Sequence, residues 1–101
     1  MKLREIAHSR TGDKGNNATV SVIVYKQEDY DLVRELVTPG RVKNFLSGIV
    51  KGEVTRYELP GIGALNFVLH DALSGGVTRS LSLDIHGKSL SSVLLDMDLE
   101  V

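Results

Sequence analysis

The chain has 101 residues, of which 42% are hydrophobic and 25% charged, a composition typical of one globular domain and not of a disordered protein. Its 12 basic and 13 acidic residues give a formal net charge of −1, and no basic block is interleaved with aromatic residues, so we expect no nucleic-acid partner. Cysteine is absent, which excludes disulfides, thiolate catalysis and cysteine-ligated metals.

Two strands are predicted in the first quarter of the chain. Residues 3–9 favour a short strand, which is followed by a polar, glycine-rich loop over residues 10–17. Residues 18–25 alternate between two faces and therefore predict a second strand. One face of that strand is apolar and consists of Ala18, Val20, Val22 and Val24.

Two helices and a third strand are predicted in the middle of the chain. Residues 28–37 place apolar side chains at helical spacing after an acidic first turn. Thr38 is a suitable N-cap and Pro39 a suitable first helical residue, so a second helix is expected to begin there. Its buried stripe would be Val42, Phe45, Leu46 and Ile49. Residues 54–59 then predict a strand.

A helix, a strand and a last helix are predicted in the remainder. The apolar run over residues 64–73 predicts a helix that ends at Gly75 and Gly76. Residues 79–86 alternate cleanly and predict the fourth strand, and the spacing of Leu90, Val93 and Leu94 predicts a short final helix.

This order of elements predicts an α+β fold in two layers, formed by residues 1–101 as a single domain. Right-handed crossovers between strands would place the helices on one face of a four-stranded mixed sheet. The other face of that sheet would carry polar side chains, namely Thr19, Ser21, Ser80, Ser82, Asp84 and His86.

The predicted loop over residues 10–17 is the first candidate for a functional site. It contains three charged residues and two glycines, namely Arg10, Gly12, Asp13, Lys14 and Gly15. Glycines allow backbone N–H groups to converge on an anion, and a lysine or arginine completes such a site. The alternative is a hairpin connection built from turn-forming residues. A hairpin turn usually needs only about two to five residues, so the predicted loop is longer than a turn alone requires.

The second candidate is the polar side of the strand predicted over residues 79–86. Ser82, Asp84 and His86 would stand about 6.5–7 Å apart and parallel, whereas a catalytic triad needs side chains that converge to hydrogen-bond distance. We interpret them as a polar platform that pairs with a base from the loop, or as a solvated sheet face. The candidate anion-binding or organising residues are therefore Arg10, Gly12, Asp13, Lys14, Gly15, Asp84, His86 and Lys88.

No metal, cofactor or membrane partner is expected. The three histidines have no second ligand at metal-binding spacing, although His8, beside the loop, leaves one such site open. Charges near the N-terminus stand where a signal peptide needs an apolar run, and no stretch approaches the roughly 20 apolar residues of a membrane span. A cytoplasmic location is the default expectation.

Several runs of the sequence form one recognisable set. Residues 6–15 (IAHSRTGDKG) contain the pattern A-x-(A/S)-R-(S/T)-G-D-K-G, and further runs are VTRYELP at 54–60, ALNFVL at 64–69, LSGGV at 73–77 and SLSLDIHGK at 80–88. Together they resemble the AtuA-like domains, which are named after the acyclic terpene utilisation protein AtuA. The resemblance covers nearly the whole chain. It departs at Asn16, where many relatives have aspartate, which argues against acid chemistry at that position.

The resemblance implies a ferredoxin-like domain that is often fused to the C-terminal end of a larger AtuA chain, in a family linked to the degradation of acyclic terpenes through CoA thioesters. We therefore expect a non-catalytic accessory or interaction subunit of a larger AtuA-like protein, or a homo-oligomer that replaces it. The alternative is a small enzyme or half-site that binds a carboxylate or acyl-CoA through Lys14 and Arg10, with acid–base help from Asp84, Asp13 or His86. That alternative requires residues 12–17 and 82–88 to meet in one pocket.

Overall fold

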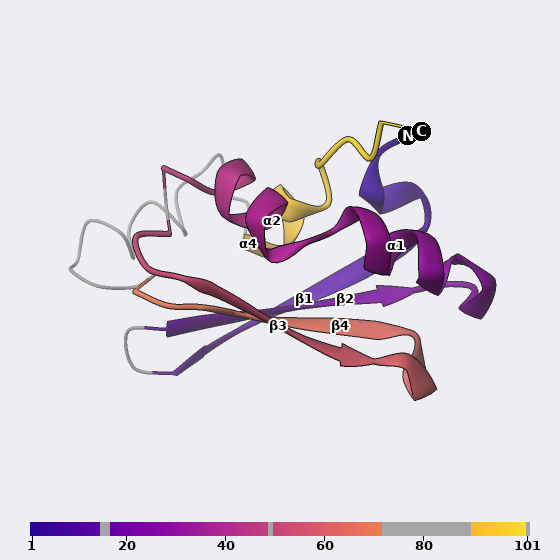
Figure 1. The fold of residues 1–101 in the computed structure, drawn as a ribbon, viewed down its shortest axis with the longest axis horizontal. Coiled ribbons are helices and arrows are strands. Elements are labelled where there is room, and N and C mark those ends of the chain that lie inside the picture. The colour runs from indigo at the N-terminus through magenta and orange to yellow at the C-terminus, as the bar shows by residue number, and fades with distance from the viewer. Residues whose placement is uncertain (15–16, 49, 72–89, 101) are drawn as a thin grey trace.

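The protein is an α+β structure in which helices cover one face of a four-stranded sheet (Figure 1). The computed structural model describes residues 1–14, 17–48, 50–71 and 90–100. The elements are the strands β1 (Ala7–Lys14), β2 (Asn17–Val24), β3 (Val54–Leu59) and β4 (Ala64–Leu69), the helices α1 (Tyr30–Leu36), α2 (Pro39–Phe45) and α4 (Leu90–Leu94), and the 3₁₀ turns η1 (Leu3–Glu5), η2 (Gln27–Asp29) and η3 (Pro60–Ile62).

The strand order is β1-β2-β4-β3, and every neighbouring pair is antiparallel. The two-layer α+β fold is confirmed, but the expected mixed sheet is wrong. Only residues 15 and 16 separate β1 from β2, and η3 with Gly63 connects β3 to β4. Connections this short can join only antiparallel strands, because a parallel pair needs a crossover of a dozen or more residues.

The polar segment that was expected to be a loop is mostly strand. β1 begins at Ala7 and continues to Lys14, and its partner residues in β2 run from Val24 to Asn17. The expected first strand over residues 3–9 is therefore placed too early, since residues 3–5 form η1. A strand at the edge of a sheet tolerates polar and glycine residues because only one of its sides is paired.

The apolar run after residue 63 is a strand and not the expected helix. Leu65, Phe67 and Leu69 of β4 are buried, and the residues between them are less so, which is the alternation of a strand. Gly63 makes the preceding turn with φ of 62°, and a Cβ atom there would lie 2.8 Å from Val24 Cγ2. The turn therefore requires glycine.

The helices confirm the local signals that predicted them. Pro39 is the first residue of α2, and the Thr38 hydroxyl accepts a hydrogen bond from the Arg41 N–H at 3.2 Å. Val42 and Leu46 are buried as expected, but Phe45 is 40% exposed, so the buried stripe is narrower than predicted. Ile49, the expected helix end at Gly75 and Gly76, and the strand expected over residues 79–86 lie outside the described residues.

The core lies between the sheet and the helices. All apolar residues of the predicted β2 face are buried, together with β4 side chains and residues from each helix: Ala18, Val20, Val22, Val24, Leu65, Phe67, Leu69, Val33, Val42, Leu90 and Leu94. Thr11 of β1 fastens α4 to this core, because its hydroxyl accepts a hydrogen bond from the Ser91 N–H at 2.9 Å. The side chain of Thr11 thus serves a distant helix terminus.

Candidate functional site

The face of the sheet turned away from the helices is the surface that the described elements leave uncovered, and we call it the open face (Figure 1). The strand register assigns it alternate residues from each strand. Those whose side chains are described are His8, Arg10 and Gly12 of β1, Asn17, Thr19, Ser21 and Ile23 of β2, Ala64, Asn66 and Val68 of β4, and Thr55, Tyr57 and Leu59 of β3.

The register also arranges these residues into rows that cross all four strands. One row is largely apolar and consists of His8, Ile23, Ala64 and Leu59. The next row, which we call the polar row, consists of Arg10, Ser21, Asn66 and Tyr57. Cross-strand neighbours on one face are close enough to interact, so each row acts as a continuous strip of surface.

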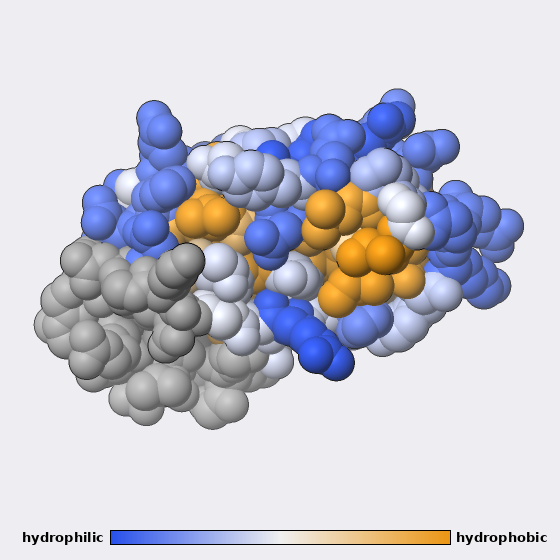
Figure 2. Space-filling model, turned by 90° about the horizontal axis from the view of Figure 1, so that it is seen from below, coloured by the Kyte–Doolittle hydropathy of each residue, from blue (hydrophilic) through white to orange (hydrophobic). Residues whose placement is uncertain are grey.

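Apolar side chains are concentrated at one end of the open face. Leu59 is 43% exposed, Ile62 in the adjoining turn 67% and Tyr25 64%. The Tyr25 ring stacks on His8, with ring centroids 5.3 Å apart. Figure 2 views this face and shows hydrophobic residues gathered in one large patch and one smaller one, with hydrophilic residues between them. We define the apolar patch as Ile23, Tyr25, Leu59 and Ile62.

The polar row beside the patch has its hydrogen-bonding groups oriented. The Ser21 hydroxyl donates to Asn66 Oδ1 at 3.1 Å. With its oxygen engaged in this way, the Asn66 amide directs its N–H donors to other acceptors. Tyr57, 53% exposed, adds a phenol at the β3 end of the row, and Arg10 adds a guanidinium at the β1 end. The row therefore offers donors along its length.

Arg10 differs from the other arginines of the described residues. Each of the others forms an ion pair, in the combinations Arg4–Asp96, Arg34–Asp31, Arg41–Glu100 and Arg56–Glu58. Arg10 makes no ion pair or hydrogen bond within the described part of the chain, and it is exposed. No Asp or Glu occupies an open-face position of β1–β4. Among the described residues, the Arg10 guanidinium therefore has no acceptor.

The structure places some of the predicted site residues and leaves others open. Arg10 and Gly12 lie on the open face, as do Thr19 and Ser21, which were expected on the outer face of the sheet. The backbone of Asp13 and Lys14 ends β1. Gly15, Asp84, His86 and Lys88 lie outside the described residues, so the meeting of residues 12–17 with 82–88 stays a prediction.

Asn66 was missed by the sequence-based prediction. Its segment was expected to be a helix, in which Asn66 would not share a face with Ser21. The strict alternation of Tyr57 and Leu59 with polar neighbours was the available signal for the β3 part of the surface. Ile62 offered no signal, because the exposure of a residue in a turn does not follow from periodicity.

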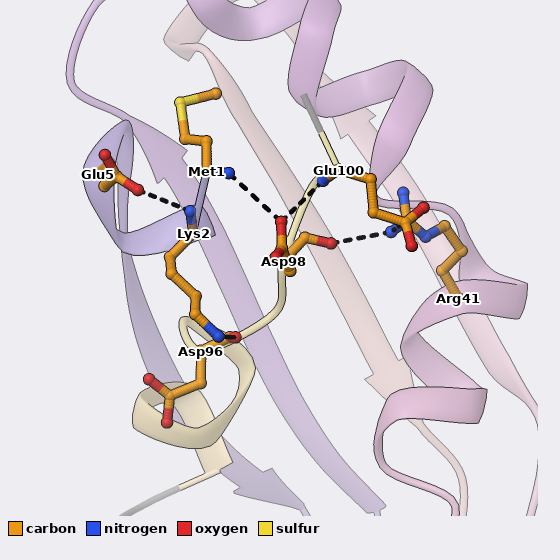
Figure 3. Close-up of polar contacts among 7 residues, drawn as sticks. All are labelled: Met1, Lys2, Glu5, Arg41, Asp96, Asp98 and Glu100. Atoms are coloured by element: carbon orange, nitrogen blue, oxygen red, sulfur yellow. Dashed lines mark hydrogen bonds and ion pairs between the residues drawn. The ribbon is translucent and has the colours of Figure 1, made fainter.

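A second polar cluster lies on the helix side and holds the C-terminal segment in place (Figure 3). The Met1 ammonium lies 3.3 Å from Asp98 Oδ1, and the Glu100 N–H donates to the same oxygen at 2.9 Å. These contacts lower the pKa of Asp98, first through the Glu100 N–H and then through the ammonium. The Arg41 guanidinium donates to the Asp98 carbonyl at 3.0 Å. We interpret the cluster as structural, since its charges are paired with one another.

The described residues offer three further observations on partners and ligands. No group of three or more histidine, aspartate or glutamate residues among them is arranged to hold a metal ion. None of the helices they form has the length and apolar character needed to traverse a bilayer. An open hollow of about 380 Å³ lies beside the second cluster and is lined by Arg41, Asn44, Phe45, Met97, Asp98 and Glu100.

Comparison with known proteins identifies one family. The family model described as the AtuA ferredoxin-like domain matches residues 1–100. The match therefore extends over essentially the whole chain, and the ferredoxin-like class implied by the sequence resemblance is confirmed. No curated protein and no solved structure matches the chain.

Proposed function

Since this chain belongs to the AtuA ferredoxin-like domain family, we propose that it is an accessory interaction domain that docks on a larger AtuA-like chain through its open face. The observation that supports this proposal is the apolar patch on a sheet face that no described element covers. The setting would be acyclic terpene or acyl-CoA metabolism, and the domain itself would be non-catalytic.

The composition of the open face supports docking to a protein. An antiparallel sheet with one face in water usually presents polar side chains there. In this chain one end of the open face instead carries the exposed side chains of Tyr25, Leu59 and Ile62. The polar row, with its Ser21–Asn66 hydrogen bond, lies beside them. Clustered aromatic and aliphatic residues bordered by polar groups are typical of protein–protein interfaces.

Leu59→Glu tests the proposal. We expect it to weaken association with a larger AtuA-like chain of the same host by at least about tenfold, because a charge would enter the centre of an apolar contact. Co-expression, affinity capture of the larger chain and a titration by calorimetry measure the effect. Circular dichroism of the free variant checks that the fold is intact.

Phe45→Glu is the matched control. Phe45 is 40% exposed and Leu59 43%, so the two variants place the same charge at similarly exposed apolar positions, one on the helix layer and one on the open face. The proposal predicts that Phe45→Glu associates like the wild type. Equal weakening by both variants, or by neither, would contradict docking through the open face.

A further inference from the structure

We infer that the partner segment which docks on the open face is acidic, and that one of its carboxylates binds the Arg10 guanidinium while apolar residues beside it pack on the apolar patch. This inference rests on the proposed function and adds the chemistry of the partner. Its evidence is the arrangement of Arg10, the polar row and the patch, described above.

Docking would remove water from Arg10, and a desolvated guanidinium needs an anionic partner. Arg10 lies on the same face as the patch, with His8 next to it along β1 and Ser21 opposite it on β2. Neither neighbour is an acid, whereas each other described arginine has its own carboxylate. An unpaired buried charge is strongly unfavourable, so a partner that covers this face must supply the counter-charge. A carboxylate suits the planar guanidinium because it accepts two parallel hydrogen bonds.

The rest of the polar row fits the same segment. Asn66 presents N–H donors because its oxygen is held by Ser21, and Tyr57 presents a hydroxyl farther along the row. These groups can donate to the acceptors of a chain segment that crosses the strands. The flanking row supplies Ile23 and Leu59 as apolar contacts for its neighbouring side chains. The surface therefore suits a segment that alternates acidic and apolar residues.

A second copy of this chain fits less well as the partner. In a two-fold contact between open faces, each copy presents the same residues to the other. The open-face positions of β1–β4 contain no Asp or Glu, so those positions could not neutralise Arg10 of the second copy. Charge complementarity therefore favours a different, acidic protein segment.

The experiment uses the full chain labelled with ¹⁵N and two short synthetic peptides. One peptide alternates leucine with glutamate, and the other has glutamine in place of each glutamate. We expect the acidic peptide to bind about tenfold more tightly or better, which corresponds to one charge-assisted hydrogen-bonded contact. The amide signals that shift should belong to open-face residues of β1, β2 and β4.

Arg10→Gln should abolish the preference for the acidic peptide, and Arg34→Gln is its matched control. Arg34 lies on α1, where its side chain forms an ion pair with the exposed Asp31, so both variants remove one positive charge but from opposite layers. If both variants lose the preference for the acidic peptide to the same extent, the preference reflects only net charge and the inference is overturned. Equal binding of the two peptides to the wild type, or shifts confined to the helix layer, would also overturn it.

The two proposals fail in different ways. If Leu59→Glu releases the larger chain but Arg10→Gln does not, the docking surface stands and the acidic partner is wrong. If Leu59→Glu leaves the larger chain bound, the proposed function itself is wrong. Light scattering of the free protein adds one further outcome. If the wild type is a dimer, and Leu59→Glu dissociates it while Arg10→Gln does not, the partner is a second copy of this chain and the acidic partner is wrong.

Discussion

Gly12 faces Thr19 across the first two strands, and the space between them is too small for a side chain. A Cβ atom on Gly12 would lie 2.8 Å from the Thr19 hydroxyl oxygen. The sequence-based hypothesis assigned this glycine to an anion-binding loop, where only its backbone freedom would count. The structure gives it a packing role at the edge of the open face, because the Thr19 side chain occupies the space beside it.

Gly12→Ala tests this residue-scale role. We expect it to lower the free energy of unfolding by about 1–3 kcal/mol, the usual cost of adding a methyl group where no space exists. In a Thr19→Ala background the obstacle is absent, and alanine should then be neutral or slightly stabilising. Urea unfolding of all four proteins in this cycle measures the coupling. The same cost in both backgrounds would show that Thr19 is not the obstacle.

Two arginines complete the end of α1 and connect it to other elements. Arg56 of β3 donates from Nη1 to the Arg34 and Val37 carbonyls at 2.5 and 3.0 Å. Arg41 of α2 donates to the Leu36 carbonyl at 3.0 Å. The last carbonyls of a helix have no partner within it, and cations are favoured there. A helix of 7 residues is thereby fixed to the sheet.

Arg56→Met is the prediction at the scale of elements. We expect it to lower the free energy of unfolding by about 2 kcal/mol, because it removes charge-assisted hydrogen bonds from partly buried carbonyls but keeps the aliphatic stem. Arg56→Lys should recover part of the loss. Thermal unfolding measures both, with Arg34→Gln as an exposed control. A loss no larger than that of the control would contradict the role given to Arg56.

How far the elements could be predicted depended on how local their signals are. The alternation of β2 and the Thr38-Pro39 helix start need only neighbouring residues, and both predictions are confirmed. The run over residues 64–69 is nearly all apolar. Its core-facing residues pack on the helices, and Val68 is apolar although it lies on the open face, so periodicity could not separate a strand from a helix. The polar edge strand β1 lacked an apolar pattern altogether.

At the scale of the whole molecule, one wrongly predicted element changed the predicted topology of the sheet. Taking residues 64–73 as a helix removed β4 from the sheet and made the connection after β3 a crossover, which produced the expected mixed sheet. The open face could be predicted only in part, through Thr19 and Ser21, since its rows need the register of all four strands. Arg10 was singled out from the sequence as a candidate residue, and both its place in a site and its ligand role stay predictions.

Acid stability is a property of the whole molecule, and Asp98 contributes to it. The pKa of Asp98 is lowered by the Glu100 N–H and by the Met1 ammonium. A carboxylate with a lower pKa in the folded state stabilises the fold above its unfolded pKa, and this contribution is lost as pH falls through the folded value. The Asp98→Asn variant should therefore be less stable than the wild type at neutral pH, and its stability should fall less than that of the wild type below about pH 4.

Unfolding by urea at pH values from neutral to strongly acidic measures this difference. The effect should be small, because the carboxylate is exposed and screened by solvent. Asp31→Asn, which removes an exposed carboxylate on α1, is the matched control. Parallel pH profiles for Asp98→Asn and the wild type would show that the cluster in Figure 3 does not contribute to acid stability.

The backbone bonds that join the two ends of the molecule have a practical consequence. Leu3 N–H donates to the Met97 carbonyl at 2.9 Å and Leu99 N–H to the Met1 carbonyl at 2.8 Å, so both ends leave the fold together on the helix side (Figure 1). A tag, a fused protein or a sensor surface attached at either end would therefore stand behind the helices. If the protein is immobilised by either terminus, every molecule would present its open face to the solution, which is the orientation that a binding measurement needs.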